Sequence, residues 1–426
     1  MDKFKKVFER AYASFVPSEK DKTKLDKSAA ELMNILNKNA ISSGVNVEFR
    51  FSGSYAKGTW IKNESDIDIF ALFNSEEEMK TLSFLVPKDF IPTFGTRKYF
   101  KGWFNGIKIE VVPVLRFSDV NSVENSIDLS VLHANYINSS LSSSQKKDVI
   151  ILKAFCKANN CYGSETYMHG FSGYSLEVMI KEFGSFTGLM KAVNSWKIPV
   201  VIGKALDKSS FPIFLMDPTN PKRNICASVN EENLSKFVLS VKRFYISPSF
   251  DFFVKKGIRE KVLNEVKVRR TKLFVFTTKI LEPRDVFLSK YVKNLDKLIK
   301  ELKAEDIEIY SFDVDYNERS ADLFLQIKNV PKTKTKAVCG PEVFSDTEIL
   351  KNFIKAHKGV FITGKHVCYD KQYDVKDFNK FILLKIKEYM SPKSIFIPTV
   401  VASLSVALIS VPLIEAWFGT TNSNLL

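Results

Sequence analysis

Residues 53–60 read GSYAKGTW, and residues 65–70 read SDIDIF. In the second stretch Asp66 and Asp68 alternate with isoleucines, which is the period of a β-strand, so both carboxylates point to the same face. Two neighbouring carboxylates repel each other unless a cation lies beside them, and Mg²⁺ prefers such oxygen ligands together with substrate phosphates. The glycine that opens the first stretch lets a phosphate approach the backbone closely. Together the two stretches predict a metal-dependent site for nucleotidyl transfer.

This pattern resembles the polymerase-beta-like nucleotidyltransferase superfamily, whose signature is Gly-Ser, a spacer and Asp-x-Asp. The complete sequence of residues 53–70 is similar to that of the archaeal-type (class I) CCA-adding enzymes, which are tRNA nucleotidyltransferases that add CCA to tRNA 3′ ends. The resemblance implies a multidomain α+β chain with a nucleotidyltransferase head. It also implies that two Mg²⁺ ions are held by carboxylates and act on the attacking and leaving oxygens.

The resembled superfamily has a third acidic ligand on a neighbouring strand. Residues 107–115 read IKIEVVPVL, an apolar run that is typical of a buried strand. Glu110 lies inside this run, where a glutamate is costly unless it is paired or bound to a metal. The alternative is a half-exposed Glu110 in a salt bridge with Lys108. We predict that Asp66, Asp68 and Glu110 are the catalytic metal ligands, although the resembled family usually has aspartate at the third position.

Three motifs downstream of the head are also closely similar in sequence to the resembled family: CYG (161–163), GFSGY (170–174) and DPTNPKRN (217–224). The resemblance implies a set of residues that contact the incoming nucleotide, namely Gly53, Ser54, Lys57, His133, Lys153, Tyr162 and Arg223. Lys57 replaces the usual arginine, which keeps the charge but loses bidentate phosphate geometry. Without the resemblance, three of these residues have another interpretation. Tyr162 could pack in the core, Lys153 could be a solvated lysine on a helix, and His133 could be a structural hydrogen-bonding group.

At 426 residues the chain is too long for one typical core, so about two to four domains are expected. Hydrophobic and charged fractions of 45% and 26% are ordinary for a globular protein, and the formal net charge is +15. Excess positive charge favours a polyanionic partner, and the resemblance implies the acceptor end of tRNA. The alternative explanation of the charge is a surface that keeps the protein soluble.

We predict three domains: a catalytic head at 1–141, a largely helical central domain at 142–252, and a tRNA-binding body with a tail at 253–426. In the head we expect strands at 66–73 and 107–115, separated by a helix and a turn near Pro92. In the body, a strand, a helix and two strands between residues 273 and 328 suggest a ferredoxin- or RRM-like unit. A linker at 332–336 is expected to lead to a tail insertion with two helices, at 346–356 and 375–389.

Five cysteines without a C-x-x-C pair predict reduced thiols and no zinc site. The start MDKFKK contains no apolar core, which predicts that there is no secretory signal. Residues 394–414 carry no charge and are long enough to span a bilayer, but two prolines and several serines favour a buried helix or strand. We therefore expect a cytoplasmic protein, monomeric or homodimeric, that does not contact a membrane.

The function that these features predict is template-independent addition of C, C and A to tRNA from CTP and ATP. One alternative is a poly(A)- or oligonucleotide-synthesising polymerase of the same superfamily, which the joint presence of the motifs at 161–174 and 217–224 disfavours. Another is an RNA-binding protein with an inactive transferase fold, which would be favoured if Glu110 did not line up with Asp66 and Asp68. A membrane-anchored protein is a third alternative, and the weakest.

Overall fold

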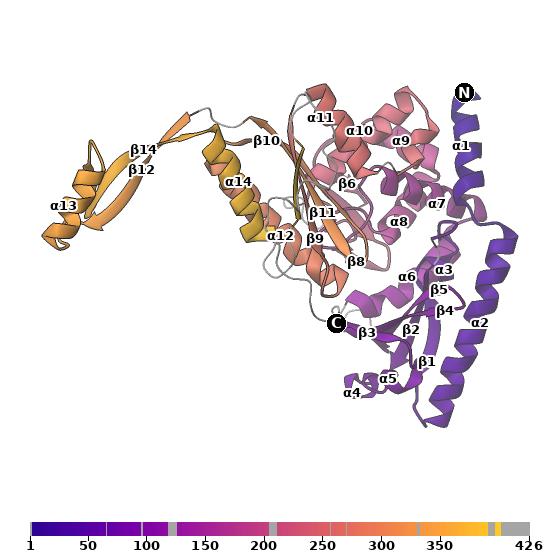
Figure 1. The fold of residues 1–426 in the computed structure, drawn as a ribbon. Coiled ribbons are helices and arrows are strands. Elements are labelled where there is room, and N and C mark those ends of the chain that lie inside the picture. Colours follow the sequence, from indigo (N-terminus) through magenta and orange to yellow (C-terminus); the bar gives the residue numbers. More distant parts are fainter. Residues whose placement is uncertain are drawn as a thin grey trace, which may run out of the picture. The chain divides into compact units, whose positions relative to one another are not determined.

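The computed structural model of the chain describes residues 2–401 except 65, 95–96, 118–125, 204–210, 256, 270, 330–332 and 391–396. The chain divides into two compact units, Met1–Lys256 and Gly257–Leu426, which are described here one at a time (Figure 1). The α+β class and the nucleotidyltransferase head predicted from the sequence are both present. The predicted boundary at residue 141 stays a prediction.

The head of the first unit is a five-stranded sheet in the order β1-β2-β5-β4-β3. Its strands are β1 (Glu48–Ser52), β2 (Asp66–Phe73), β3 (Ile91–Phe94), β4 (Lys98–Phe104) and β5 (Ile107–Leu115). The two central strands, β2 and β5, run parallel, and the outer pairs are antiparallel. The isoleucines of β2 are fully buried on one face, where the long helix α2 (Glu19–Ser42) contributes Leu32 and Leu36 to the same core. The opposite face of β2 therefore carries Asp66 and Asp68.

Between β2 and β5 the sequence prediction is partly wrong. Two short helices, α4 (Glu76–Met79) and α5 (Leu82–Leu85), are present where one helix was expected. Pro92 lies in β3 instead of a turn, and β4 was not predicted at all. Because β3 is the edge strand of the sheet, its proline does not have to donate a hydrogen bond on the open side.

The rest of the first unit is mainly helical. Its helices are α1 (Asp2–Phe15), α6 (Ser126–Ser140), α7 (Ser143–Ala158), α8 (Gly173–Phe183), α9 (Phe186–Val193), α10 (Glu231–Ile246) and the 3₁₀ turn η2 (Phe250–Phe253). Aromatic rings fill its core, including Phe155, Phe186 and Phe244, and α1 adds Phe4 and Phe8 to this cluster. The N-terminal helix thus packs on the helical part of the unit rather than on the head sheet.

A small sheet in this helical part combines β6 (Val200–Ile202), β7 (Ile213–Asp217) and β8 (Asn220–Asn224). The second half of the motif at 217–224 forms β8, antiparallel to β7. Asn224 stabilises this arrangement because its side chain accepts a hydrogen bond from the Leu215 backbone and donates one to the Ile213 carbonyl.

The second unit contains the predicted strand, helix, strand and strand. They are β9 (Lys272–Lys279), α12 (Arg284–Ala304), β10 (Glu308–Tyr316) and β11 (Ser320–Asn329), preceded by α11 (Ile258–Arg269). The sheet order is β10-β11-β9-β15, where β15 (Ile397–Val401) pairs with β9. This pairing accounts for residues 397–401 of the uncharged C-terminal segment as a strand, and the part from 402 to 414 lies outside the described residues.

The predicted tail forms a second sheet, with β12 (Thr333–Glu342), β13 (Phe361–Thr363) and β14 (His366–Asp374) beside helix α13 (Thr347–Ala356). The second predicted helix, α14 (Val375–Met390), packs on α12, where Tyr389 donates a hydrogen bond to Glu301. The expectation of a linker at 332–336 is wrong for residues 333–336, which begin β12. Among the described residues, no helix is both long enough and apolar enough to cross a membrane.

The expectation that all five cysteines are reduced is also wrong. Cys339 on β12 and Cys368 on β14 are directly opposite each other in the strand register and form a disulfide. Only the pairing of two strands that are distant in sequence brings these thiols together. Cys156, Cys161 and Cys226 are free and buried.

Candidate active site

The predicted carboxylates are brought to one face of the head sheet by the parallel pairing of β2 and β5. In this register Asp66 is opposite Lys108, and Asp68 is opposite Glu110. The intervening residues, Ile67 and Ile109, are fully buried on the other face. Glu110 therefore lines up with Asp66 and Asp68, which is the arrangement that the inactive-fold alternative lacks.

Lysines on the same face lie among these carboxylates. The Lys108 ammonium is 3.3 Å from Asp66 Oδ2 and 3.3 Å from Glu110 Oε1, and the Lys101 ammonium is 3.2 Å from the same oxygen of Glu110. The salt bridge between Glu110 and Lys108 that was considered as an alternative is thus present. Burial, followed by the charges of Glu110 and Asp66, raises the pKa of Asp68 to about 6.

The short helix α3 (Gly53–Lys57) follows β1 directly, and its first residue packs against this carboxylate face. Gly53 has a φ of +62°, and a Cβ atom at this position would lie only 1.7 Å from Asp68 Oδ2. Glycine is therefore required both for the backbone conformation and for the space beside Asp68. Ser54 follows in the first turn of α3.

A cavity of about 430 Å³ opens over the carboxylates and is lined by five of the predicted site residues. These residues are Gly53, Lys57, Asp68, Glu110 and His133. Tyr174, from the motif at 170–174, completes one wall. The other predicted residues do not line this cavity: Asp66, Ser54, Lys153, Tyr162 and Arg223.

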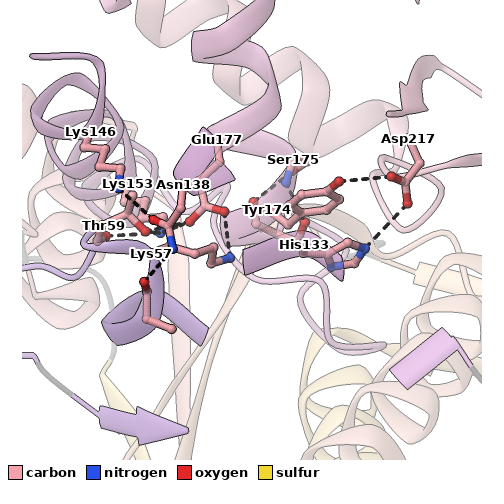
Figure 2. Close-up of polar contacts among 12 residues, drawn as sticks. Lys57, Thr59, His133, Asn138, Lys146, Lys153, Tyr174, Ser175, Glu177 and Asp217 are labelled. Carbon is pink, nitrogen blue, oxygen red and sulfur yellow. Dashed lines mark hydrogen bonds and ion pairs between the residues drawn. The ribbon is translucent and has the colours of Figure 1, made fainter. Parts of the chain in front are cut away.

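Lys57 and Lys153 meet at Glu177, a buried glutamate on α8 (Figure 2). Glu177 Oε2 lies 2.6 Å from the Lys57 ammonium, and Oε1 lies 2.8 Å from that of Lys153. Burial alone would raise the pKa of Glu177, but the charges of Lys153 and Lys57 lower it to about 2. Tyr162 is close to Lys153, since a Cβ atom added to Gly173 would lie 3.2 Å from the Tyr162 hydroxyl and 3.3 Å from Lys153 Cε.

A second buried carboxylate, Asp217, connects His133 and Arg223. Figure 2 shows it between Tyr174 and His133. It accepts hydrogen bonds from the Tyr174 hydroxyl at 3.0 Å and from the Arg223 guanidinium at 3.2 Å. His133 stacks on the Tyr174 ring with centroids 3.7 Å apart, and its Nε2 lies 3.7 Å from Asp217 Oδ2. Desolvation lowers the pKa of His133, although Asp217 opposes the shift. Arg223 itself lines a separate pocket beside β8.

Glu177 and Asp217 were not singled out from the sequence. Glu177 lies within the apolar helical run SLEVMI, and Asp217 ends the apolar run IFLMD. A carboxylate in such a run signals a buried, paired group, which is the same reasoning that identified Glu110. What the sequence lacks is the identity of the partners, because these come from other elements.

The donor set suits a hard divalent cation, since Asp66, Asp68 and Glu110 offer only oxygen atoms. In the part of the chain that the structure describes, no three acidic, histidine or cysteine side chains are gathered tightly enough to hold an ion. The carboxylates repel one another, and Lys101 and Lys108 pair with two of them. Binding of a cation would therefore have to displace these ammonium groups.

Comparison with known proteins defines the class first. Residues 32–131 match the family described as nucleotidyltransferase domain, and residues 147–254 match the second domain of tRNA nucleotidyltransferases. The chain thus has a nucleotidyltransferase head of the polymerase-beta-like fold followed by the domain that accompanies it in tRNA nucleotidyltransferases.

Curated relatives then specify the group. The chain is 27% identical to the CCA-adding enzymes of Saccharolobus islandicus and Saccharolobus solfataricus, over 87% of this chain and 90% of each relative. It is also 27% identical to the CCA-adding enzyme of Methanothermobacter thermautotrophicus, over 79% of this chain and 78% of the relative. The predicted resemblance is confirmed by this similarity, and the predicted enzyme class is the one that these relatives carry.

Proposed function

We propose that the chain is a template-independent enzyme that adds C, C and A to the 3′ end of tRNA, using CTP and ATP. The observation that carries the proposal is the common face of Asp66, Asp68 and Glu110 beneath a cavity that also holds Lys57 and His133. The similarity to CCA-adding enzymes over most of the chain supports the choice of tRNA as substrate. A net charge of +15 fits a polyanionic partner.

The proposed roles follow from where each side chain lies. Asp66, Asp68 and Glu110 would hold Mg²⁺, which when bound neutralises phosphate charge and lowers the pKa of the attacking 3′-hydroxyl. Lys57 lines the cavity, where its positive charge would attract the triphosphate. Gly53 leaves the backbone open to close approach beside Asp68.

Of the remaining predicted nucleotide contacts, His133 lines the cavity and Arg223 lines a separate pocket. The His133–Tyr174 stack offers a flat aromatic wall on which the sugar or base of the nucleotide would rest. We assign Arg223 to the base, because its guanidinium is oriented by Asp217 and its donors suit a base edge. We also assign contacts with the incoming nucleotide, as the resemblance implies, to Ser54, Lys153 and Tyr162. Buried polar groups left unpaired by a wrong base would supply the choice between CTP and ATP.

Incorporation into a defined tRNA tests the proposal. A transcript ending at the discriminator base is incubated with the protein and Mg²⁺, with CTP alone, ATP alone, or both. We expect two additions with CTP, one further addition with ATP, and then a stop. Asp66→Ala should abolish the product because it removes one of the paired carboxylates.

The same experiment distinguishes the alternatives. A long ladder from ATP alone would identify a poly(A)-type polymerase. Binding of the transcript without incorporation of any nucleotide would identify an RNA-binding protein with an inactive transferase fold, and Glu110 and the competing lysines would be the first residues to examine.

A further inference from the structure

Glu177 is fully buried on α8, and both of its oxygens are engaged. Oε2 accepts a hydrogen bond from the Lys57 ammonium at 2.6 Å. Oε1 accepts one from Lys153 at 2.8 Å and one from the Thr59 hydroxyl at 2.6 Å. Lys153 also donates to the Thr59 hydroxyl and carbonyl oxygens. The four residues form a closed polar cluster beside the cavity (Figure 2).

Such a cluster fixes the position of its members. A buried carboxylate is strongly unfavourable unless it is paired and hydrogen-bonded, so Glu177 requires its ammonium partners. A lysine side chain otherwise moves freely on a flexible four-carbon stem. The bond to Glu177 removes this freedom from Lys57, whose side chain is only 9% exposed. The Lys57 side chain therefore loses its conformational entropy when the protein folds, and not when a ligand binds.

The cluster also relates Lys57 to the cavity. Lys57 is the last residue of α3, whose first residue, Gly53, packs on Asp68, and Lys57 lines the cavity together with Asp68 and Glu110. Tyr174, one helical turn before Glu177 on α8, lines the same cavity. Glu177 itself does not line it. Helix α8 thus supplies one wall through Tyr174 and holds the cationic part of another through Glu177.

We propose that Glu177 is a positioning residue for the triphosphate: it holds the ammonium of Lys57 at the cavity wall, oriented before the nucleotide binds. The inference rests on the proposed function, because it takes the cavity as the site of a nucleoside triphosphate. Glu177 acts through Lys57 and not by contact with the ligand, since a carboxylate against phosphate would be repelled. Lys153 and Thr59 complete the hydrogen bonding that keeps Glu177 in place.

Loss of this positioning should weaken binding of the nucleotide more than the chemical step. Lys57 would contact phosphate already in the ground state, so its interaction contributes equally to the bound substrate and to the transition state. Glu177→Gln keeps the shape but loses the charge that orients Lys57. We expect the Kd and KM for CTP to rise about tenfold, with kcat changed less than about threefold.

The test is a double-mutant cycle on the full-length protein, with CTP and inorganic tripolyphosphate as probes in titration calorimetry. Wild type, Glu177→Gln, Lys57→Met and the double variant are compared. Glu177→Gln should weaken both probes in the wild-type background and have a clearly smaller effect in the Lys57→Met background, where only its pairing with Lys153 remains. Asp148→Asn is the control: it removes the charge of a partly buried carboxylate on α7, which accepts hydrogen bonds from Tyr12 and from the Phe186 backbone. Its binding should equal that of wild type.

Wild-type binding by Glu177→Gln, or an equal loss in both backgrounds, would overturn the inference. If Glu177→Gln does not fold, Glu177→Asp replaces it in the cycle, because it keeps the charge but shortens the reach to Lys57. Failure of the proposed function gives different results. A protein that binds both probes but does not extend tRNA refutes the CCA proposal and leaves Glu177 to be judged by the cycle. A protein that binds neither probe refutes both.

Discussion

The carboxylate of Asp68 packs directly against the backbone of Gly53. A side chain on Gly53 would begin 1.7 Å from Asp68 Oδ2, and the φ of +62° already disfavours other residues. The Gly-Ser pair and the Asp-x-Asp pair, which are separate in the sequence, are thus in direct contact through Gly53 and Asp68. This contact places the first residue of α3 beside the carboxylate face of β2.

Gly53→Ala should abolish nucleotide incorporation, because the new Cβ atom must displace Asp68 or the loop. Gly106→Ala is a matched control, since Gly106 also has a positive φ, of +74°, but nothing lies within 4 Å of an added Cβ atom. We expect both variants to lose about 1–2 kcal/mol of unfolding free energy from the strained backbone. Only Gly53→Ala should lose activity, and an active Gly53→Ala enzyme would contradict the assigned contact.

Lys108→Met should strengthen binding of a divalent cation to the carboxylate face. The ammonium of Lys108 lies 3.3 Å from oxygens of both Asp66 and Glu110, where it competes with an added cation. We expect the Kd for Mn²⁺, measured by calorimetry in the absence of nucleotide, to fall about tenfold. Lys98→Met, which removes an exposed lysine from the same sheet, should leave the Kd unchanged. Weaker Mn²⁺ binding by Lys108→Met would show that the lysine supports the site.

Glu110→Asp should remain active within about tenfold of wild type, whereas Glu110→Gln should lose about 100-fold or more in kcat. Aspartate keeps the charge that a metal ligand or base requires, and glutamine does not. Glu110 pairs with Lys101 and Lys108 at the surface of the cavity, so neither variant should prevent folding. Single-turnover incorporation of CMP measures the effect. A Glu110→Gln enzyme as active as wild type would remove Glu110 from the catalytic set.

Lys153 should make the stability of the protein depend on pH in the alkaline range. Desolvation by burial lowers its pKa to about 8 from the usual 10.5, despite the opposing charge of Glu177. Between these values the unfolded chain binds more protons than the folded one, so the unfolding free energy should rise with pH from about 8 to 9.5, by up to about 1 kcal/mol per unit. Denaturant titrations measure this slope. It should vanish in Lys153→Met and persist in Lys147→Met, a change of an exposed lysine on the same helix.

Local sequence pattern predicted the elements that carry the site. The alternation of Asp66 and Asp68 with isoleucines gave β2 its bounds and its two faces, and the apolar run around Glu110 did the same for β5. These predictions succeed because the period of buried residues is a property of consecutive positions.

Predictions failed where contacts between distant segments decide the outcome. Pro92 was taken as a turn, but it lies on the edge strand of a sheet whose order the sequence does not reveal. Cys339 and Cys368 were expected as thiols, but strand pairing in the tail places them opposite each other. Glu177 and Asp217 were overlooked because each forms its ion pairs with side chains on other elements.

The sequence by itself determined the kind of chemistry: a Gly-Ser turn, paired carboxylates on one strand face and an excess of basic residues. The tertiary structure decided how these groups meet. Parallel pairing of β2 with β5 sets Glu110 beside Asp68, and burial of Glu177 sets Lys57 against the cavity. The physical reason is that side-chain direction follows from local backbone geometry, whereas the burial and pairing of charges depend on segments that only the complete fold brings together.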